Sequence, residues 1–202
     1  MKIALLNGSP RGKNSTSYYL LEELSKSLQH QDATIFTKAT LPSLCDCLKE
    51  LDVLVLAFPL YVDSMPASLI DQLDVIKSTG IHNTKLKVYA IVNNGFYEAK
   101  QNHVAISMVW NWCKTCGFQK GYAIGVGGGE MVRFAPLGHG PEKNLGKAMQ
   151  ELTKHICENQ STMDQYVEPN FPKFLYKVAA HYNWKKQIRS NGLKPKDIKR
   201  KL

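Results

Sequence analysis

The chain has 202 residues, of which 44% are hydrophobic and 21% charged, and it carries a formal net charge of +9. This composition is ordinary for a soluble globular protein, and no apolar stretch approaches the roughly 20 residues of a membrane-spanning helix. The charge is unevenly placed, because residues 161–202 hold ten Lys or Arg and only three Asp or Glu. The basic character therefore belongs to the C-terminal segment, and the preceding residues are close to neutral.

Short apolar runs alternate along the chain with segments whose apolar residues recur at helical spacing. This alternation is typical of a parallel sheet covered by helices on both faces. The predicted strands are residues 2–7, 33–37, 52–58, 86–93 and 121–126, and the predicted helices are 15–29, 38–50, 67–77, 104–116 and 142–157. The pattern predicts an α/β fold with a flavodoxin-like, doubly wound, five-stranded parallel sheet in the order 2-1-3-4-5. In such sheets ligands bind beyond the carboxyl ends of the strands, so the site is expected there.

The first candidate site follows the first predicted strand, where residues 6–17 read LNGSPRGKNSTS. Four hydroxyl side chains precede a predicted helix whose first-turn amides are available to an anion. The spacing excludes a P-loop, because three residues separate Gly8 from Gly12 and Lys13 is followed by Asn14. It also excludes the G-x-G-x-x-G fingerprint, whose second glycine position holds a proline here. We expect a loop that binds one terminal phosphate; the alternative is a helix cap that binds no ligand.

Two stretches resemble a known family. LNGSPRGKNSTS and FPLYVDSMPASLIDQLD, residues 58–74, are similar to the phosphate loop and the flavin-side loop of the NAD(P)H-dependent FMN reductase branch of the flavodoxin-like superfamily. The resemblance covers residues 2 to about 160 and implies an FMN-binding domain over residues 1–160, with NADPH or NADH as the co-substrate. The cofactor-binding residues that it implies are Ser9, Arg11, Asn14, Ser15, Thr16, Pro59, Leu60, Tyr61, Val62, Ser64, Met65, Asn93, Asn94, Gly95 and Phe96. It implies no catalytic side chain, because the flavin itself carries the chemistry.

Some of these segments admit simpler interpretations. Residues 59–66 would otherwise be a surface turn with an exposed tyrosine, and Asn94-Gly95 would be a tight turn that contacts no ligand. The glycines at 127–129 permit the close approach of a nicotinamide, and they are equally compatible with a flexible loop. His139 is expected to be a solvated loop residue.

The cysteine pattern argues against a metal or disulfide centre. Five cysteines, an odd number, without an apparent export signal indicate reduced thiols and a cytoplasmic protein. Cys45 and Cys47 are too few to hold an iron–sulfur cluster, so no metal is expected. Cys113 and Cys116 form a C-x-x-C at the end of a predicted helix, whereas redox-active pairs lie at helix beginnings. We expect these two thiols to be buried and structural.

Residues 161–202 are expected to form a basic C-terminal helical extension. Phe171, Phe174, Leu175, Val178 and Tyr182 recur at helical spacing among cations, and the segment resembles extensions of some flavodoxin-like NAD(P)H oxidoreductases. Packing on its own domain or on a dimer mate is the favoured interpretation. Contact with an anionic membrane surface is the second, and nucleic-acid binding is not expected because no base-reading module is present.

Trp110 and Trp112 lie about 200° apart around their predicted helix, at roughly 100° per residue. One is therefore expected to face the core and the other solvent or a second copy, which suggests a homodimer.

Two functions fit these observations. The first is an FMN-dependent NAD(P)H oxidoreductase, which passes a hydride from NAD(P)H to the flavin and then reduces a small-molecule electron acceptor such as a quinone, nitroaromatic, flavin or metal ion. The alternative is a non-enzymatic flavodoxin-like electron carrier. The reductase is favoured, because carriers of this superfamily are typically acidic and the body of this chain is near neutral.

Overall fold

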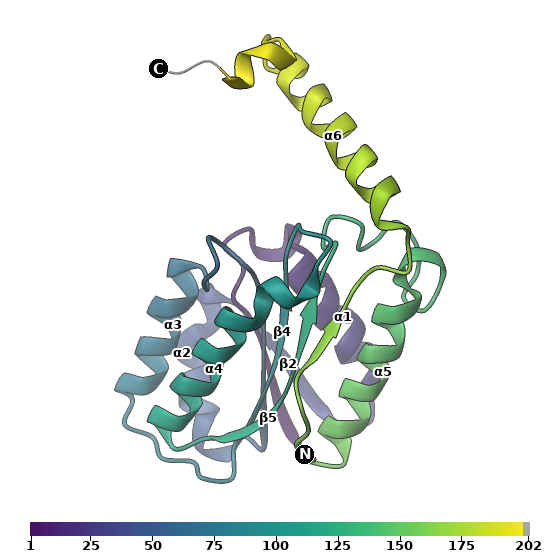
Figure 1. The fold of residues 1–202 in the computed structure, drawn as a ribbon. Helices are drawn as coiled ribbons and strands as arrows, with labels where there is room; N and C mark the ends of the chain where they lie inside the picture. The colour runs from purple at the N-terminus through teal and green to yellow at the C-terminus, as the bar shows by residue number, and fades with distance from the viewer. Residues whose placement is uncertain (200–202) are drawn as a thin grey trace. The chain divides into compact units, whose positions relative to one another are not determined.

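A parallel sheet organises the first 169 residues of the computed structural model, which describes residues 1–199 (Figure 1). The last three residues of the predicted extension lie outside the described part. The six strands follow the order β2-β1-β3-β4-β5-β6, which confirms the flavodoxin-like arrangement predicted from the sequence. They are β1 (Lys2–Asn7), β2 (Asp32–Phe36), β3 (Val53–Pro59), β4 (Lys87–Asn93), β5 (Gln119–Val126) and β6 (Gln165–Val167).

The sixth strand corrects the prediction of a five-stranded sheet. β6 pairs in parallel with β5, with Ile124 opposite Gln165 and Val126 opposite Val167. Three residues are too few to show a strand pattern in the sequence. The segment is held instead by distant contacts: the carboxylate of Asp164 accepts a hydrogen bond from the amide of Ala123 at 3.1 Å. The edge strand therefore depends on tertiary contacts that the local sequence does not contain.

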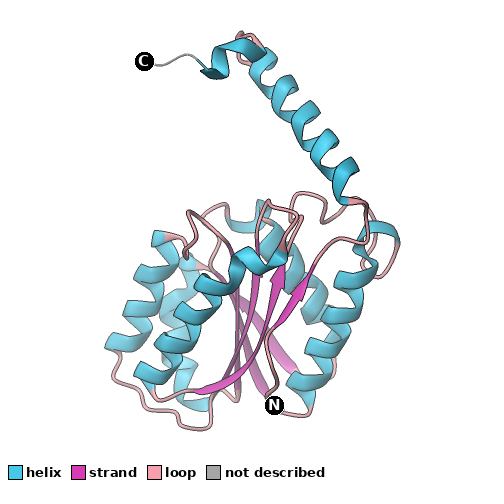
Figure 2. Cartoon of the chain, viewed as in Figure 1, coloured by secondary structure: helices cyan, strands magenta, loops and turns pink. Residues whose placement is uncertain are grey.

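Helices cover both faces of the sheet (Figure 2). They are α1 (Thr16–Ser27), α2 (Leu41–Cys47), α3 (Ala67–Ser78), α4 (His103–Cys116), α5 (Lys143–Cys157) and, beyond the sheet, α6 (Lys173–Ser190). The predicted weak helix over residues 38–50 is α2 with a 3₁₀ turn at each end. No helix within residues 1–199 is both long and apolar enough to cross a membrane.

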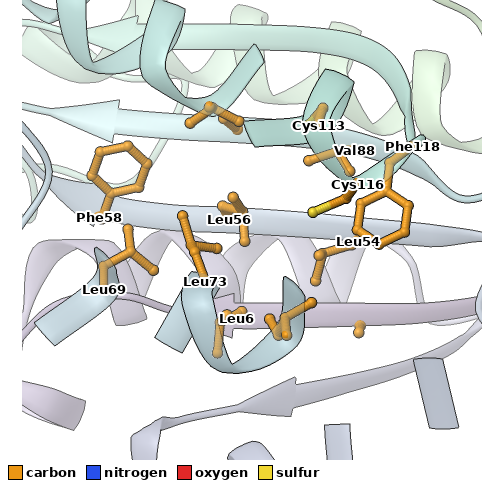
Figure 3. Close-up of a cluster of buried hydrophobic side chains, with 14 of the residues drawn as sticks. Leu6, Leu54, Leu56, Phe58, Leu69, Leu73, Val88, Cys113, Cys116 and Phe118 are labelled. Atoms are coloured by element: carbon orange, nitrogen blue, oxygen red, sulfur yellow. The ribbon is translucent and has the colours of Figure 1, made fainter. Parts of the chain in front are cut away.

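Each face of the sheet has its own hydrophobic core, because alternate strand residues point to opposite faces. On β3, Leu54, Leu56 and Phe58 join the core under α2, α3 and α4, which Figure 3 shows in part. The intervening residues Val53 and Val55 join the core under α1 and α5. The central strands are apolar on both faces, as buried parallel strands require.

The thiols of Cys113 and Cys116 are free and buried in the core under α4, close to Phe118 (Figure 3). Burial raises the pKa of both thiols above the ordinary value, because the interior disfavours a thiolate. The structural role expected from the sequence is therefore supported. Cys157 is exposed at the end of α5.

The two tryptophans of α4 differ from the expectation of one inward and one outward ring, because both are half-buried. Nε1 of Trp110 donates to the Asp164 carboxylate at 2.9 Å, and Nε1 of Trp112 donates to the carbonyl of Leu73 at 3.1 Å. Neighbouring elements thus pair both indole N–H groups, as partly buried tryptophans require. The rings give no independent indication of a dimer.

A second compact unit begins at Asn170 and contains α6 and a 3₁₀ turn over Pro195–Lys199. The first 169 residues hold 16 Lys or Arg and 16 Asp or Glu, so their formal charges cancel. The remaining ten cations and one acidic residue give residues 170–202 the whole formal charge of +9.

Gly146 on α5 generates a prediction about folding. A Cβ at this position would lie 2.2 Å from the backbone nitrogen of Gly138, so the helix and the loop before it touch through backbone atoms. Gly146→Ala would gain about 1 kcal/mol of helix propensity but force these backbones apart, and overpacking of this kind costs about 1–3 kcal/mol or more. We expect a net loss of unfolding free energy in urea denaturation. Gly80→Ala, which meets no atom within 4 Å, is the matched control and should cost about 1 kcal/mol for its positive φ.

The burial of the thiols predicts a reactivity pattern. In the native protein at mildly alkaline pH, iodoacetamide should modify exposed Cys157 and leave buried Cys113 and Cys116 unmodified until the chain unfolds. Peptide mass spectrometry after timed quenching measures this order. Fast modification of Cys113 in the folded protein would contradict the structural role.

Candidate functional site

A pocket of about 370 Å³ lies at the carboxyl edge of the sheet, among the loops that follow β1, β3, β4 and β5. This volume is in the range of small-molecule and cofactor sites, and the edge is where doubly wound sheets bind ligands. Most residues predicted to bind the cofactor line it: Ser9, Arg11, Asn14, Ser15, Thr16, Pro59, Leu60, Tyr61, Asn93, Asn94 and Gly95. The structure thus brings together residues that are up to 86 positions apart in the sequence.

Four predicted residues do not line this pocket: Val62, Ser64, Met65 and Phe96. Backbone bonds in both directions between Tyr61 and Ser64 close a tight turn, whose tip holds Val62 with 98% of its surface exposed. Ser64 Oγ donates to the sulfur of Met108 at 3.5 Å, and Met65 is buried in the core under α3 and α4. Phe96 is exposed.

Two further lining residues, Ser17 and Gly129, belong to the hydroxyl-rich stretch and to the glycine run considered from the sequence. Three were not named from the sequence, Glu130, Val132 and Arg133, and all three belong to the loop that follows β5. The rule that loops after parallel strands share one edge of the sheet would have placed this segment at the site. Its single cation, Arg133, was the signal available in the sequence.

The loop after β1 is built to present the first turn of α1. Gly12 adopts φ of +57°, which only glycine takes without strain. Ser15 is the N-cap: its Oγ accepts a bond from the amide of Tyr18 at 3.1 Å and donates to the Gly12 carbonyl at 2.6 Å. Its hydroxyl therefore holds the helix start in place. Among the described residues, the amides of Thr16 and Ser17 have no acceptor, so this turn can receive an anion.

Two buried asparagines at strand ends hold the loops in position. Asn7 ends β1, and its side chain accepts from the amide of Ser9 at 3.1 Å and donates to the Gly12 carbonyl at 3.0 Å. Asn93 ends β4, and its Nδ2 donates both to Ser17 Oγ at 2.8 Å and to the Phe58 carbonyl at 3.1 Å. Asn93 therefore ties the end of β4 to the first turn of α1 and to the end of β3.

The side chain of Asn94 shapes its own loop. Its Oδ1 accepts from the amide of Phe96 at 2.9 Å, and its Nδ2 donates to the Glu98 carbonyl at 3.2 Å. The tight turn considered from the sequence is therefore present, and it lies at the pocket.

The glycines after β5 are packed against the loop after β4. A Cβ at Gly127 would lie 2.2 Å from the Tyr97 carbonyl oxygen, and one at Gly129 would lie 2.8 Å from that of Asn94. The amide of Gly129 also donates to the Asn94 carbonyl at 2.7 Å. These glycines permit a close approach of two backbones, which differs from the flexible loop considered from the sequence.

The charged groups of the pocket are two guanidinium groups and one carboxylate, from Arg11, Arg133 and Glu130. Beside it, Glu142 lines a much smaller cavity of about 10 Å³, and burial raises the pKa of this carboxyl to about 7. The pocket itself thus has a net positive lining, which suits an anionic ligand.

These features fit FMN. The unpaired amides and the two guanidinium groups suit a phosphate, and the wall formed by Pro59, Leu60 and Tyr61 supplies an apolar surface of the kind that a flat ring needs. Among the described residues, no group of three or more His, Cys, Asp or Glu could hold a metal ion.

Solved structures with the same fold include two reductases and a flavodoxin. An NADPH-quinone reductase from P. pentosaceus has a TM-score of 0.55 at 13% identity, over 77% of this chain and 97% of that one. A flavodoxin variant from Pseudomonas aeruginosa has a TM-score of 0.56 at 15% identity, over 76% and 97%. An FMN-dependent NADH-azoreductase from Bacillus anthracis, solved with FMN, has a TM-score of 0.54 at 12% identity, over 77% and 99%. At these identities the likeness shows the fold.

No curated protein sequence matches the chain. The family model that describes NADPH-dependent FMN reductases matches residues 1–112, which is more than half of the 202 residues. The matched segment contains β1 to β4 and three of the four loops that line the pocket. The chain therefore belongs to the NADPH-dependent FMN reductase family of oxidoreductases.

Proposed function

We propose that this protein binds FMN in the pocket of about 370 Å³, reduces it with NADPH or NADH, and passes the electrons to a small acceptor. One observation carries the proposal: the loop after β1, within the family match, presents unpaired helix amides to a pocket that also has an apolar wall. This arrangement accommodates a ligand that carries both a phosphate and a flat ring.

The phosphate of FMN would bind at the first turn of α1. The amides of Thr16 and Ser17 point their N–H groups beyond the helix start, and the helix dipole favours an anion there. Arg11, on the preceding loop, adds a positive charge. Ser15 acts indirectly in this scheme, because its hydroxyl is used to cap the helix.

The flavin ring would lie against the loops after β3 and β4. Pro59, Leu60 and Tyr61 offer an apolar surface, and Asn94 and Gly95 line the same pocket. Bound FMN would supply the hydride-accepting and electron-donating chemistry. The chain would contribute orientation, because hydride transfer needs donor and acceptor atoms about 3–3.5 Å apart.

The acceptor class follows from the residues near the pocket. Tyr61 lines it and is 41% exposed, and Phe96, which follows pocket-lining Gly95, is 58% exposed. Exposed rings suit a flat conjugated acceptor, since aromatic faces stack with one another. This favours a quinone, nitroaromatic or free flavin over a metal ion.

A charge at the helix cap tests the phosphate site. Asp can accept the capping bond from the Tyr18 amide as Ser does, but it cannot donate to the Gly12 carbonyl. Ser15→Asp should therefore fold with some loss of stability while placing a negative charge beside the proposed phosphate. We expect the Kd for FMN to rise at least about tenfold, and the Kd for riboflavin, which has no phosphate, to stay within about twofold. Fluorescence titration measures both constants.

Ser15→Asn is the matched control for this experiment, because it preserves the cap without adding charge. Its affinity for FMN should equal that of the unaltered protein. An unchanged FMN affinity in Ser15→Asp would place the phosphate elsewhere.

Anaerobic stopped-flow mixing tests the reductase assignment. The FMN-loaded protein should lose its oxidised flavin absorbance on mixing with NADPH or NADH, at a rate that saturates with nucleotide concentration. The comparison of the two nucleotides gives the co-substrate preference. An FMN-loaded protein that neither nucleotide reduces, but that dithionite does reduce, would be an electron carrier instead.

A further inference from the structure

We infer that Arg133, on the loop after β5, binds the FMN phosphate in addition to Arg11 and the amides of α1. Arg133 lies in a segment outside the family match. The inference rests on the proposed FMN function. Its basis is the position of the Arg133 side chain. A hydrogen bond and a tyrosine ring hold the guanidinium group at the start of α1, and the backbone of the residue is strained.

The backbone of Arg133 adopts a conformation that a residue with a side chain normally avoids. Its φ is +91°, in the region that favours glycine, and such a conformation costs of order 1–3 kcal/mol. The flanking chain enforces it: Met131 and Val132 are buried, and the Phe134 amide donates to the Met131 carbonyl at 2.9 Å. Strain of this kind persists at positions where the side chain is needed in a particular place.

The guanidinium group is held at the start of α1. Its Nη2 donates to the carbonyl oxygen of Ser15 at 2.9 Å, and its Cζ lies 4.9 Å from the centroid of the Tyr19 ring. A tyrosine is neutral near physiological pH, and the face of its ring attracts a cation. Two contacts from one helix therefore fix the position of this group.

The anchored guanidinium retains capacity to bind a ligand. An arginine has five N–H donors, and the hydrogen bond to Ser15 accounts for one of them. Arg133 belongs to none of the ion pairs found among residues 1–199, which join Lys2 to Glu50, Lys26 to Glu23 and Lys120 to Asp164. Glu130 also lines the pocket, but among the described residues no carboxylate lies within 4.0 Å of the Arg133 guanidinium, so this cation is available to an incoming anion.

The position of the guanidinium selects the FMN phosphate as the anion. Ser15 is the residue directly before the amides of Thr16 and Ser17, at which the phosphate is proposed to bind. The Ser15 carbonyl points along α1, where it also accepts the Tyr19 amide at 3.2 Å. Arg133 nevertheless lines the same pocket as Thr16 and Ser17, so its remaining donors are available to a phosphate bound there. Arginine also matches phosphate oxygens with a planar pair of donors, which a lysine does not offer.

The family match does not supply this role. The family match ends at residue 112, and Arg133 lies 21 positions beyond it. The loop after β5 reaches the site because its glycines approach the loop after β4 and because Thr16 Oγ1 donates to the Gly129 carbonyl at 3.4 Å.

Arg133→Gly separates a phosphate-binding role from a structural one. Glycine relieves the strain at φ of +91°, which offsets the loss of the bond to Ser15 and of the contact with the Tyr19 ring, so the variant should unfold close to the temperature of the unaltered protein. It removes the guanidinium, so we expect the Kd for FMN to rise about 10- to 100-fold, as charged hydrogen bonds predict. The Kd for riboflavin should stay within about twofold, because riboflavin carries no phosphate.

Two further variants complete the test. Lys114→Gln removes one positive charge at an exposed position near the end of α4 and should leave the Kd for FMN unchanged. Tyr19→Phe keeps the ring face and should also bind FMN normally, whereas Tyr19→Ala should weaken FMN binding severalfold without affecting riboflavin.

The outcomes that would overturn the inference are distinct. Equal losses of FMN and riboflavin affinity in Arg133→Gly would show that the residue only positions the loop. An unchanged FMN affinity would also overturn it, and if the KM for NADPH rose instead, the guanidinium would bind the dinucleotide phosphates. An unaltered protein that binds neither flavin would remove the proposed function itself, together with this inference.

Discussion

The buried amide of Asn93 is the interaction on which the geometry of the pocket depends. It ends β4, and its two donors bond Ser17 in the first turn of α1 and the carbonyl of Phe58 near the end of β3. A buried donor left unpaired costs about 1–3 kcal/mol, so these three segments hold their relative positions together. The phosphate end of the pocket and its apolar wall are therefore spaced by one side chain that belongs to neither.

The fourth loop is added to this framework by backbone contacts. Gly129 bonds the carbonyl of Asn94, so the loop after β5 is placed by the residue that follows Asn93. Val132 then enters the core under α1 and α5, and Arg133 follows it at the pocket. The position of Arg133 is therefore defined although it lies on a loop, because the residues before it are anchored to the sheet and to the core.

The sequence was sufficient for the features that local patterns determine. Strands such as β3 and β4 are continuous apolar runs, and the loop after β1 follows one of them directly, so the sheet order and one side of the pocket could be predicted. β6 could not, because it is short and depends on contacts from Asp164. The turn between Tyr61 and Ser64 was only the alternative interpretation of its segment, since it places Val62 and Asp63 at φ of +50° and +56°, where valine is disfavoured.

The same limit applies to individual side chains. The hydroxyl of Ser15 was predicted to bind phosphate, but the structure shows that it caps α1, and a sequence does not reveal which acceptor a hydroxyl will satisfy.

The placement of charge is likewise not evident from the sequence. The first 169 residues have no net formal charge, so anion binding at the pocket cannot come from an overall excess of cations. It must come from placement: charges are screened over about 8 Å at physiological salt, and within that distance Arg11, Arg133 and the amides of α1 determine the potential that a phosphate would meet.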